Sequence, residues 1–179
     1  VVSKTNYAIT LHGGGNYLYA AERVVYDENT PASLELAKAM GPEWNLLQKF
    51  KAAPDNIQGK CTEKGISCIT VELGGRGGGF PGINLLEKNI ETTVRGIMNI
   101  MKHLGMIEGE AKYAKSWTVV SLPHGVYSRN GGFVVPEPAF ELGKKVTKGT
   151  PLLRLLNFLG EEAEIVKAPW DGVVVSIGT

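Results

Sequence analysis

The chain has 179 residues, of which 43% are hydrophobic, and its 19 basic and 18 acidic residues give a formal net charge of +1. This length and apolar content suffice for one domain, or one and a half, with a real core. A nearly neutral chain without a basic, aromatic-rich stripe excludes nucleic acid as the expected partner and favours a small molecule.

Two apolar runs each end near a side chain that could bind a metal or transfer a proton, and glycines follow in both cases. The first, residues 7–11, is predicted as a strand and leads into His12 and three glycines. The second, residues 66–73, is predicted as a buried strand and carries Glu72 close to its end. Open α/β sheets place ligand-binding and catalytic groups at such strand ends. A histidine and a glutamate brought together there indicate metal-assisted hydrolysis.

Helices are predicted between these two strands. Thr30 and Pro31 have the pattern of a helix start, and Gly41 ends that helix. A second helix is predicted over residues 43–50. Residues 56–65 are polar and irregular, which favours a loop with at most one helical turn.

A glycine cluster and a long helix follow Glu72. Residues 74–79 contain five glycines and Arg76, a composition that favours a mobile loop carrying an arginine toward the substrate, with a plain flexible connection as the alternative. Residues 87–104 place their apolar side chains on one helical face, and Gly105 ends the helix.

Short β runs replace the helical pattern beyond residues 109–111. They occupy residues 117–122, 132–135, 152–156, 163–166 and 173–177. We therefore predict two domains, an α/β domain over residues 1–112 and an all-β domain over residues 113–179, the second of them incomplete.

The cysteines and the hydropathy of the chain indicate where in the cell the protein is located. Cys61 and Cys68 lack a CxxC motif or further ligands, so buried free thiols are expected. No apolar run approaches the about 18 residues of a membrane span, and no charged leader precedes one. We expect a cytoplasmic protein that does not contact a membrane.

These motifs resemble the succinylglutamate desuccinylase and aspartoacylase family of zinc hydrolases, which is related in fold to zinc carboxypeptidases. The resemblance depends on residues 11–14 (Leu-His-Gly-Gly), residues 71–75 (Val-Glu-Leu-Gly-Gly), the long helix and the β-rich tail. It implies part of a carboxypeptidase-like mixed α/β sheet flanked by helices. A small β-barrel domain, similar to a biotinyl or lipoyl carrier barrel, would follow, but without the carrier's modified lysine.

The resemblance also implies a zinc site. His12 matches one zinc ligand of the family, and Glu72 matches its general base. The family takes its other two ligands from a His-x-x-Glu motif, which does not occur in this sequence. We therefore expect these ligands in an N-terminal segment absent from this chain, lost or associated as a separate piece. The 179 residues alone are expected to be inactive.

The start of the second domain offers further substrate-binding candidates. His124 lies there, and Tyr127 or Arg129 could close over the site and bind a substrate carboxylate. Residues of a surface loop are the alternative interpretation.

The resulting prediction is a zinc-dependent amidohydrolase that removes an N-acyl group from a small amino acid or derivative. One alternative is a zinc carboxypeptidase that acts on peptides. Another is a noncatalytic binding module. Whether the protein forms a homo-oligomer stays open.

Overall fold

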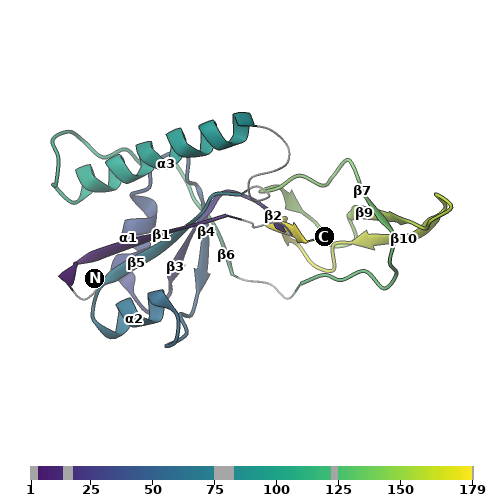
Figure 1. Ribbon diagram of the computed structural model, residues 1–179, viewed down its shortest axis with the longest axis horizontal. Coiled ribbons are helices and arrows are strands. Elements are labelled where there is room, and N and C mark those ends of the chain that lie inside the picture. The colour runs from purple at the N-terminus through teal and green to yellow at the C-terminus, as the bar shows by residue number, and fades with distance from the viewer. Residues whose placement is uncertain (1–3, 14–17, 75–82, 122–124, 179) are drawn as a thin grey trace. The chain divides into compact units, whose positions relative to one another are not determined.

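Two compact units make up the chain in the computed structural model, which describes residues 4–13, 18–74, 83–121 and 125–178 (Figure 1). Unit 1 comprises Val1–Leu122 with Ile177–Thr179, and unit 2 comprises Pro123–Ser176. The helices of the described residues all belong to unit 1. None of them combines the length and the apolar character that a membrane crossing requires.

A five-stranded mixed sheet forms the centre of unit 1. Its strands are β1 (Tyr7–His12), β3 (Arg23–Asp27), β4 (Leu46–Phe50), β5 (Ser67–Glu72) and β6 (Thr118–Ser121). The order is β1-β5-β3-β4-β6, and only β3 and β5 are antiparallel neighbours. The start of β3 therefore lies at the same end of the sheet as the last residues of β1 and β5. A separate two-stranded sheet pairs β2 (Leu18–Ala20) with β12 (Ser176–Gly178), and residues 177–178 of β12 are counted in unit 1.

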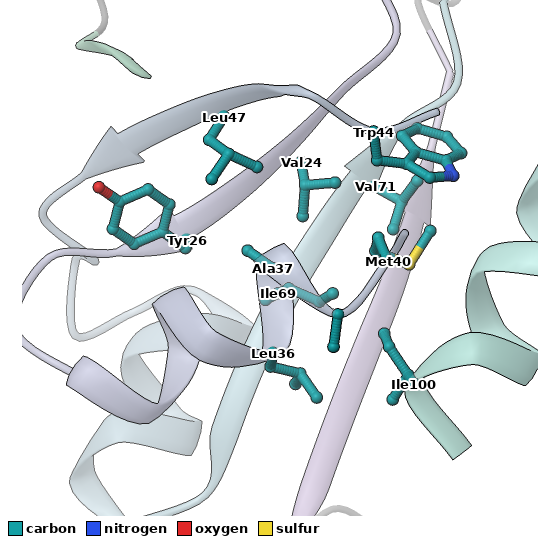
Figure 2. Close-up of a cluster of buried hydrophobic side chains, with 11 residues drawn as sticks. Val24, Tyr26, Leu36, Ala37, Met40, Trp44, Leu47, Ile69, Val71 and Ile100 are labelled. Atoms are coloured by element: carbon teal, nitrogen blue, oxygen red, sulfur yellow. The ribbon is translucent and has the colours of Figure 1, made fainter. Parts of the chain in front are cut away.

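Helices cover both faces of the five-stranded sheet. They are α1 (Pro31–Lys38), α2 (Ile57–Glu63) and α3 (Ile83–His103). On one face, α1 and Ile100 of α3 pack against a buried cluster of strand residues, shown in Figure 2: Val24, Tyr26, Leu47, Ile69 and Val71. On the other face, Cys61 of α2 packs with Cys68 and Ala8. Because side chains alternate along a strand, the even-numbered residues of β5 face the α2 side.

The two cysteines are free and buried, as the sequence analysis predicted. Burial raises the pKa of the Cys68 thiol to about 12, and the neighbouring Cys61 adds to this shift. Cys68 therefore stays protonated at neutral pH and packs as a small apolar group.

The helix predicted over residues 43–50 is wrong, because that segment contains strand β4. Its apolar residues have helical spacing, but Leu46, Leu47 and Gln48 are all buried in succession. Strand β4 has a neighbour on each side, β3 and β6. A strand buried on both faces shows no alternation of polar and apolar residues, so its period is ambiguous in the sequence.

The structure confirms two of the helices predicted from the sequence. Helix α1 begins after Thr30 with Pro31 in its first turn, and Gly41 follows with φ +102°, as predicted. Helix α3 confirms the long helix, but its predicted apolar face is only partly buried, because Ile90, Val94 and Met98 on that face are exposed.

The loop predicted over residues 56–65 is wrong for most of its length, because seven of these residues form α2. The Asn56 side chain caps the start of α2 by accepting a hydrogen bond from the Gly59 amide at 2.8 Å, so a polar segment that looks irregular in the sequence still forms a helix.

Strand β6 belongs to unit 1, whereas the sequence analysis placed it in the second domain. It pairs in parallel with β4, with Leu46 opposite Thr118. The compact units accordingly divide between Leu122 and Pro123, ten residues beyond the expected boundary. The change in composition near residues 109–111 marks the connection from α3 to β6.

Unit 2 consists of short antiparallel strands in its described residues. Its three-stranded sheet has the order β10-β9-β7, with β7 (Phe133–Pro136), β9 (Pro151–Leu156) and β10 (Glu162–Lys167). A second pair joins β8 (Lys145–Val146) to β11 (Gly172–Val173). Its buried apolar residues are Leu155, Val166, Ala168 and Val174. A closed barrel stays a prediction.

Candidate functional site

His12 and Glu72 lie side by side at the ends of two parallel strands. In the pairing of β1 with β5, His12 is directly opposite Glu72. Residues in register project from the same face of a sheet. Nδ1 of His12 is accordingly 3.9 Å from Oε1 of Glu72. The structure thus brings together the two residues on which the sequence analysis depends.

The two side chains differ in exposure. The side chain of His12 is 57% exposed and that of Glu72 is 18% exposed. Their 3.9 Å separation exceeds a hydrogen bond, so neither group is held by the other. The imidazole is open to a ligand, while the carboxylate is largely enclosed by the protein.

A hydroxyl pair joins the same two strands two residues earlier. Thr10 Oγ1 and Thr70 Oγ1 are 2.6 Å apart, and the two residues are register partners. Thr70 is buried. This bond ties β1 to β5 on the face that carries His12 and Glu72.

The backbone turns sharply after Glu72. Leu73 still donates its amide to the His12 carbonyl at 2.8 Å, but Gly74 has φ +65°. A Cβ at position 74 would lie 2.7 Å from the carbonyl oxygen of Ala20. Glycine is therefore required there by its conformation and by the close approach. Arg76 and the rest of the predicted mobile loop lie outside the described residues.

The described residues do not complete a metal site. Among them, no group of three or more His, Cys, Asp or Glu side chains is placed to hold a metal ion. Catalytic zinc takes three protein ligands and keeps one position for water or substrate. His12 and Glu72 by themselves fall short of this number.

Tyr127 and Arg129, the other predicted substrate-binding residues, belong to unit 2. Tyr127 is 84% exposed. The backbone amides of Arg129 and Asn130 donate to Oε2 of Glu164 at 2.8 and 3.0 Å. These bonds, that of Arg129 first, hold the pKa of the Glu164 carboxyl below its usual value. A role of Tyr127 or Arg129 toward a substrate stays a prediction, and His124 lies outside the described residues.

The sequence analysis missed Arg23, which lies on the other side of β5 from His12. Arg23 is directly opposite Glu72 in the antiparallel pairing of β3 with β5. It is only 6% exposed. The signal in the sequence was a basic residue at the start of the apolar run over residues 23–27, a place where a charge is seldom buried.

Comparison with known proteins gives one curated sequence relative. No protein-family model matches the chain. The chain is 27% identical, over 187 aligned positions, to the N-alpha-acetyl-L-2,4-diaminobutyric acid deacetylase of Halomonas elongata. The alignment covers 98% of this chain and 52% of the relative.

Solved structures share the fold of the chain. The apo structure of the ectoine utilization protein EutE (DoeB) from Ruegeria pomeroyi matches with a TM-score of 0.78 and 21% identity, over 99% of this chain and 56% of that protein. A succinylglutamate desuccinylase from Silicibacter sp. TM1040 matches with a TM-score of 0.75 and 20% identity, over 99% of this chain and 54% of that protein.

The chain spans about half the length of the relatives it matches. Its sequence relative is a deacetylase of an N-acyl amino acid, and its structural neighbours include a succinylglutamate desuccinylase. The mixed α/β architecture of unit 1 agrees with their fold. The resemblance to the succinylglutamate desuccinylase and aspartoacylase family, inferred from the sequence, is therefore confirmed.

Proposed function

We propose that this chain is part of a zinc-dependent amidohydrolase that removes an acyl group from the amino nitrogen of a small amino acid or derivative. The observation that carries the proposal is the register of β1 and β5, which sets His12 beside Glu72 on one face at the ends of two parallel strands. The deacetylase activity of the sequence relative supports the reaction class.

Glu72 is proposed as the general base. Its carboxylate takes a proton from the water that attacks the acyl carbonyl, and later returns a proton to the leaving amine. A carboxylate with a largely enclosed side chain suits this role, because a fixed base stays within reach of the water. Arg76, Tyr127 and Arg129 remain candidates for binding the carboxylate of the substrate.

His12 is proposed as one zinc ligand. Its exposed imidazole and its position beside Glu72 support this assignment. We propose that two further ligands come from polypeptide outside these 179 residues, because the sequence contains no His-x-x-Glu motif and the described residues form no metal site. With a single imidazole, the chain would bind zinc weakly by itself. We place the protein in the cytoplasm, and we propose no nucleic-acid or membrane partner.

Zinc content and activity test the proposal together. The longest polypeptide that carries this sequence is analysed for zinc per chain, with its intact mass measured on the same sample. We expect about one zinc and turnover of short N-acyl amino acids. Glu72→Gln keeps the zinc and lowers kcat by several orders of magnitude, whereas His12→Ala loses the zinc.

Two surface variants serve as controls. His103→Ala removes a histidine whose Nδ1 lies 2.8 Å from the Tyr113 hydroxyl on the exposed side of α3, and it should change neither zinc content nor rate. Glu63→Gln removes an exposed carboxylate paired with Lys60, with the same expectation.

The alternatives give other results. Turnover of peptides in place of short acylated amino acids would identify a carboxypeptidase. A polypeptide that binds no zinc, with no effect of Glu72→Gln on any activity, would identify a noncatalytic binding module and overturn the proposal.

A further inference from the structure

Four neighbouring strands contribute one polar row to the face that carries His12. The row begins with His12 on β1 and continues with Glu72 on β5 and Arg23 on β3, each directly opposite the next. Gln48 on β4 extends it, because its side chain reaches diagonally from its position opposite Val25. Arg23 Nε donates to Gln48 Oε1 at 2.7 Å.

The guanidinium of Arg23 is fixed and almost completely buried. Besides the bond to Gln48, its Nη1 donates to the carbonyl oxygen of Ala21 at 3.0 Å. The residue is 6% exposed, and Gln48 is 3% exposed. Two hydrogen bonds from one rigid planar group to two partners leave the side chain little freedom to move.

Both of these acceptors are neutral, so the charge of Arg23 is not neutralised by the bonds that hold it. No carboxylate of the described residues lies within 4.0 Å of it as an ion-pair partner. Burial lowers the pKa of Arg23, and the negative charge of Glu72 opposes this shift. Glu72, directly opposite Arg23 on the neighbouring strand, is thus an acidic group whose charge favours the charged form of the buried guanidinium.

The Glu72 carboxylate, in turn, is not held by His12, because the Nδ1 atom of His12 lies 3.9 Å from Oε1, beyond hydrogen-bond distance. A general base must stay near one position to accept its proton. The fixed positive charge of Arg23, on the neighbouring strand β3 and on the same sheet face, restrains where the Glu72 carboxylate lies.

We propose that Arg23, held in place by Gln48, is a positioning residue that restrains the conformation of the Glu72 carboxylate beside His12. This inference rests on the proposed role of Glu72 as general base. In this proposal Arg23 acts through Glu72 and not by binding the substrate.

Steady-state kinetics of the longest active polypeptide test the proposal. Arg23→Met replaces the guanidinium side chain with an unbranched apolar one and removes its charge. We expect kcat to fall about 10- to 100-fold while KM changes less than about threefold, because a displaced base slows the chemical step and leaves binding intact. Arg23→Lys restores the charge and should recover part of kcat.

A matched control shows whether the effect depends on the location of Arg23 or follows from the loss of any arginine. Arg95→Met removes an arginine that pairs with Glu43 on the exposed side of α3, and it should leave kcat and KM unchanged. If Arg23→Met is insoluble, Gln48→Leu is measured in its place, since it releases the guanidinium without removing it. For Gln48→Leu we also expect kcat to fall, but by less than in Arg23→Met.

A structural measurement keeps this inference separate from the proposed function. Crystal structures of the wild type, Arg23→Met and Arg23→Lys report the conformation of Glu72 whether or not the protein is active. The proposal expects a moved or disordered carboxylate in Arg23→Met and a wild-type one in Arg23→Lys.

An unchanged carboxylate in Arg23→Met overturns the inference, even if Glu72→Gln has shown the enzyme to be a hydrolase. A rise in KM at constant kcat also overturns it, because Arg23 would then bind the substrate. A moved carboxylate in a protein without activity supports the positioning role and counts against the proposed function alone.

Discussion

At the residue scale, Asp27 shows how a buried carboxylate connects separate segments of unit 1. It ends β3, and its carboxylate accepts hydrogen bonds from the Thr62 hydroxyl of α2 at 2.7 Å and from the backbone amides of Asn29 at 3.1 Å and Ala52 at 3.4 Å. Burial by itself would raise the pKa of this carboxyl, but these hydrogen bonds outweigh burial and hold the pKa below its usual value.

Asp27 should therefore stabilise unit 1 in a pH-dependent way. Because its pKa is lower in the folded state than in the unfolded state, the stabilisation is present above the unfolded pKa of about 3.9 and disappears as the pH falls through the folded value. At pH 7, Asp27→Asn should lower the free energy of unfolding by about 2 kcal/mol.

Urea unfolding at a series of pH values measures this difference. The wild type and Asp27→Asn should approach each other below about pH 3.9. Asp55→Asn, which changes an exposed carboxyl, is the control and should follow the wild type. A gap between wild type and Asp27→Asn that stays constant down to low pH would contradict the prediction.

The candidate site shows which residues a sequence can reveal. His12 and Glu72 stand out because each interrupts an apolar run just before glycines, a local pattern. Arg23 is part of the same row only because β3 runs antiparallel to β5, which brings its first residue to the end of the sheet where Glu72 lies. That pairing joins residues far apart in the chain, so no local pattern indicates it.

At the element scale, α3 presents two different faces. Ile100 is 3% exposed and packs into the core beneath the helix. Ile90, Val94 and Met98 are 55%, 54% and 44% exposed, although they too are apolar. A helix with apolar residues on both its buried and its open side contributes to stability mainly through the buried side.

Two truncations on α3 test this distinction. Ile100→Ala should lower the free energy of unfolding by about 2–5 kcal/mol, because it leaves a cavity in the core. Met98→Ala should change it by less than about 0.5 kcal/mol. Urea unfolding of both variants gives the comparison, and equal losses would show that the helix is rotated about its axis.

Elements with a clear period were predictable from the sequence, and elements without one were not. Helix α3 repeats its apolar residues over 21 positions, which fixes its type. Strand β4 has five residues, three of them buried in succession, and such a short run fits a helix equally well. Its neighbours β3 and β6 decide its conformation, and their positions follow from the tertiary fold.

At the scale of the whole molecule, each unit has a core of its own. Leu155 of β9 is 2% exposed among the buried residues of unit 2, whereas Ile165 on the adjacent strand β10 is 39% exposed. The small number of buried side chains in unit 2 makes each of them important for its stability.

Hydrogen exchange should show this dependence directly. In Leu155→Ala, the amides of the β9 and β10 ladder should exchange faster by about 30-fold or more, because about 2 kcal/mol or more of stability is lost. Ile165→Ala is the matched control on the same sheet and should exchange nearly as the wild type does. The same acceleration in both variants would contradict the assignment of Leu155 to the core of unit 2.

The hydrogen bond between the Thr10 and Thr70 hydroxyls bears on how accurately β1 aligns with β5 during folding. Within the described part of the chain, β1 is an edge strand and pairs with β5 alone, so its alignment depends on few contacts. A slip of one residue would turn the imidazole of His12 to the opposite face, and a slip of two would carry it about 7 Å along the strand. The hydrogen bond between these two hydroxyls thus favours the correct register of β1 on β5, and with it the position of His12 beside Glu72, from two residues away.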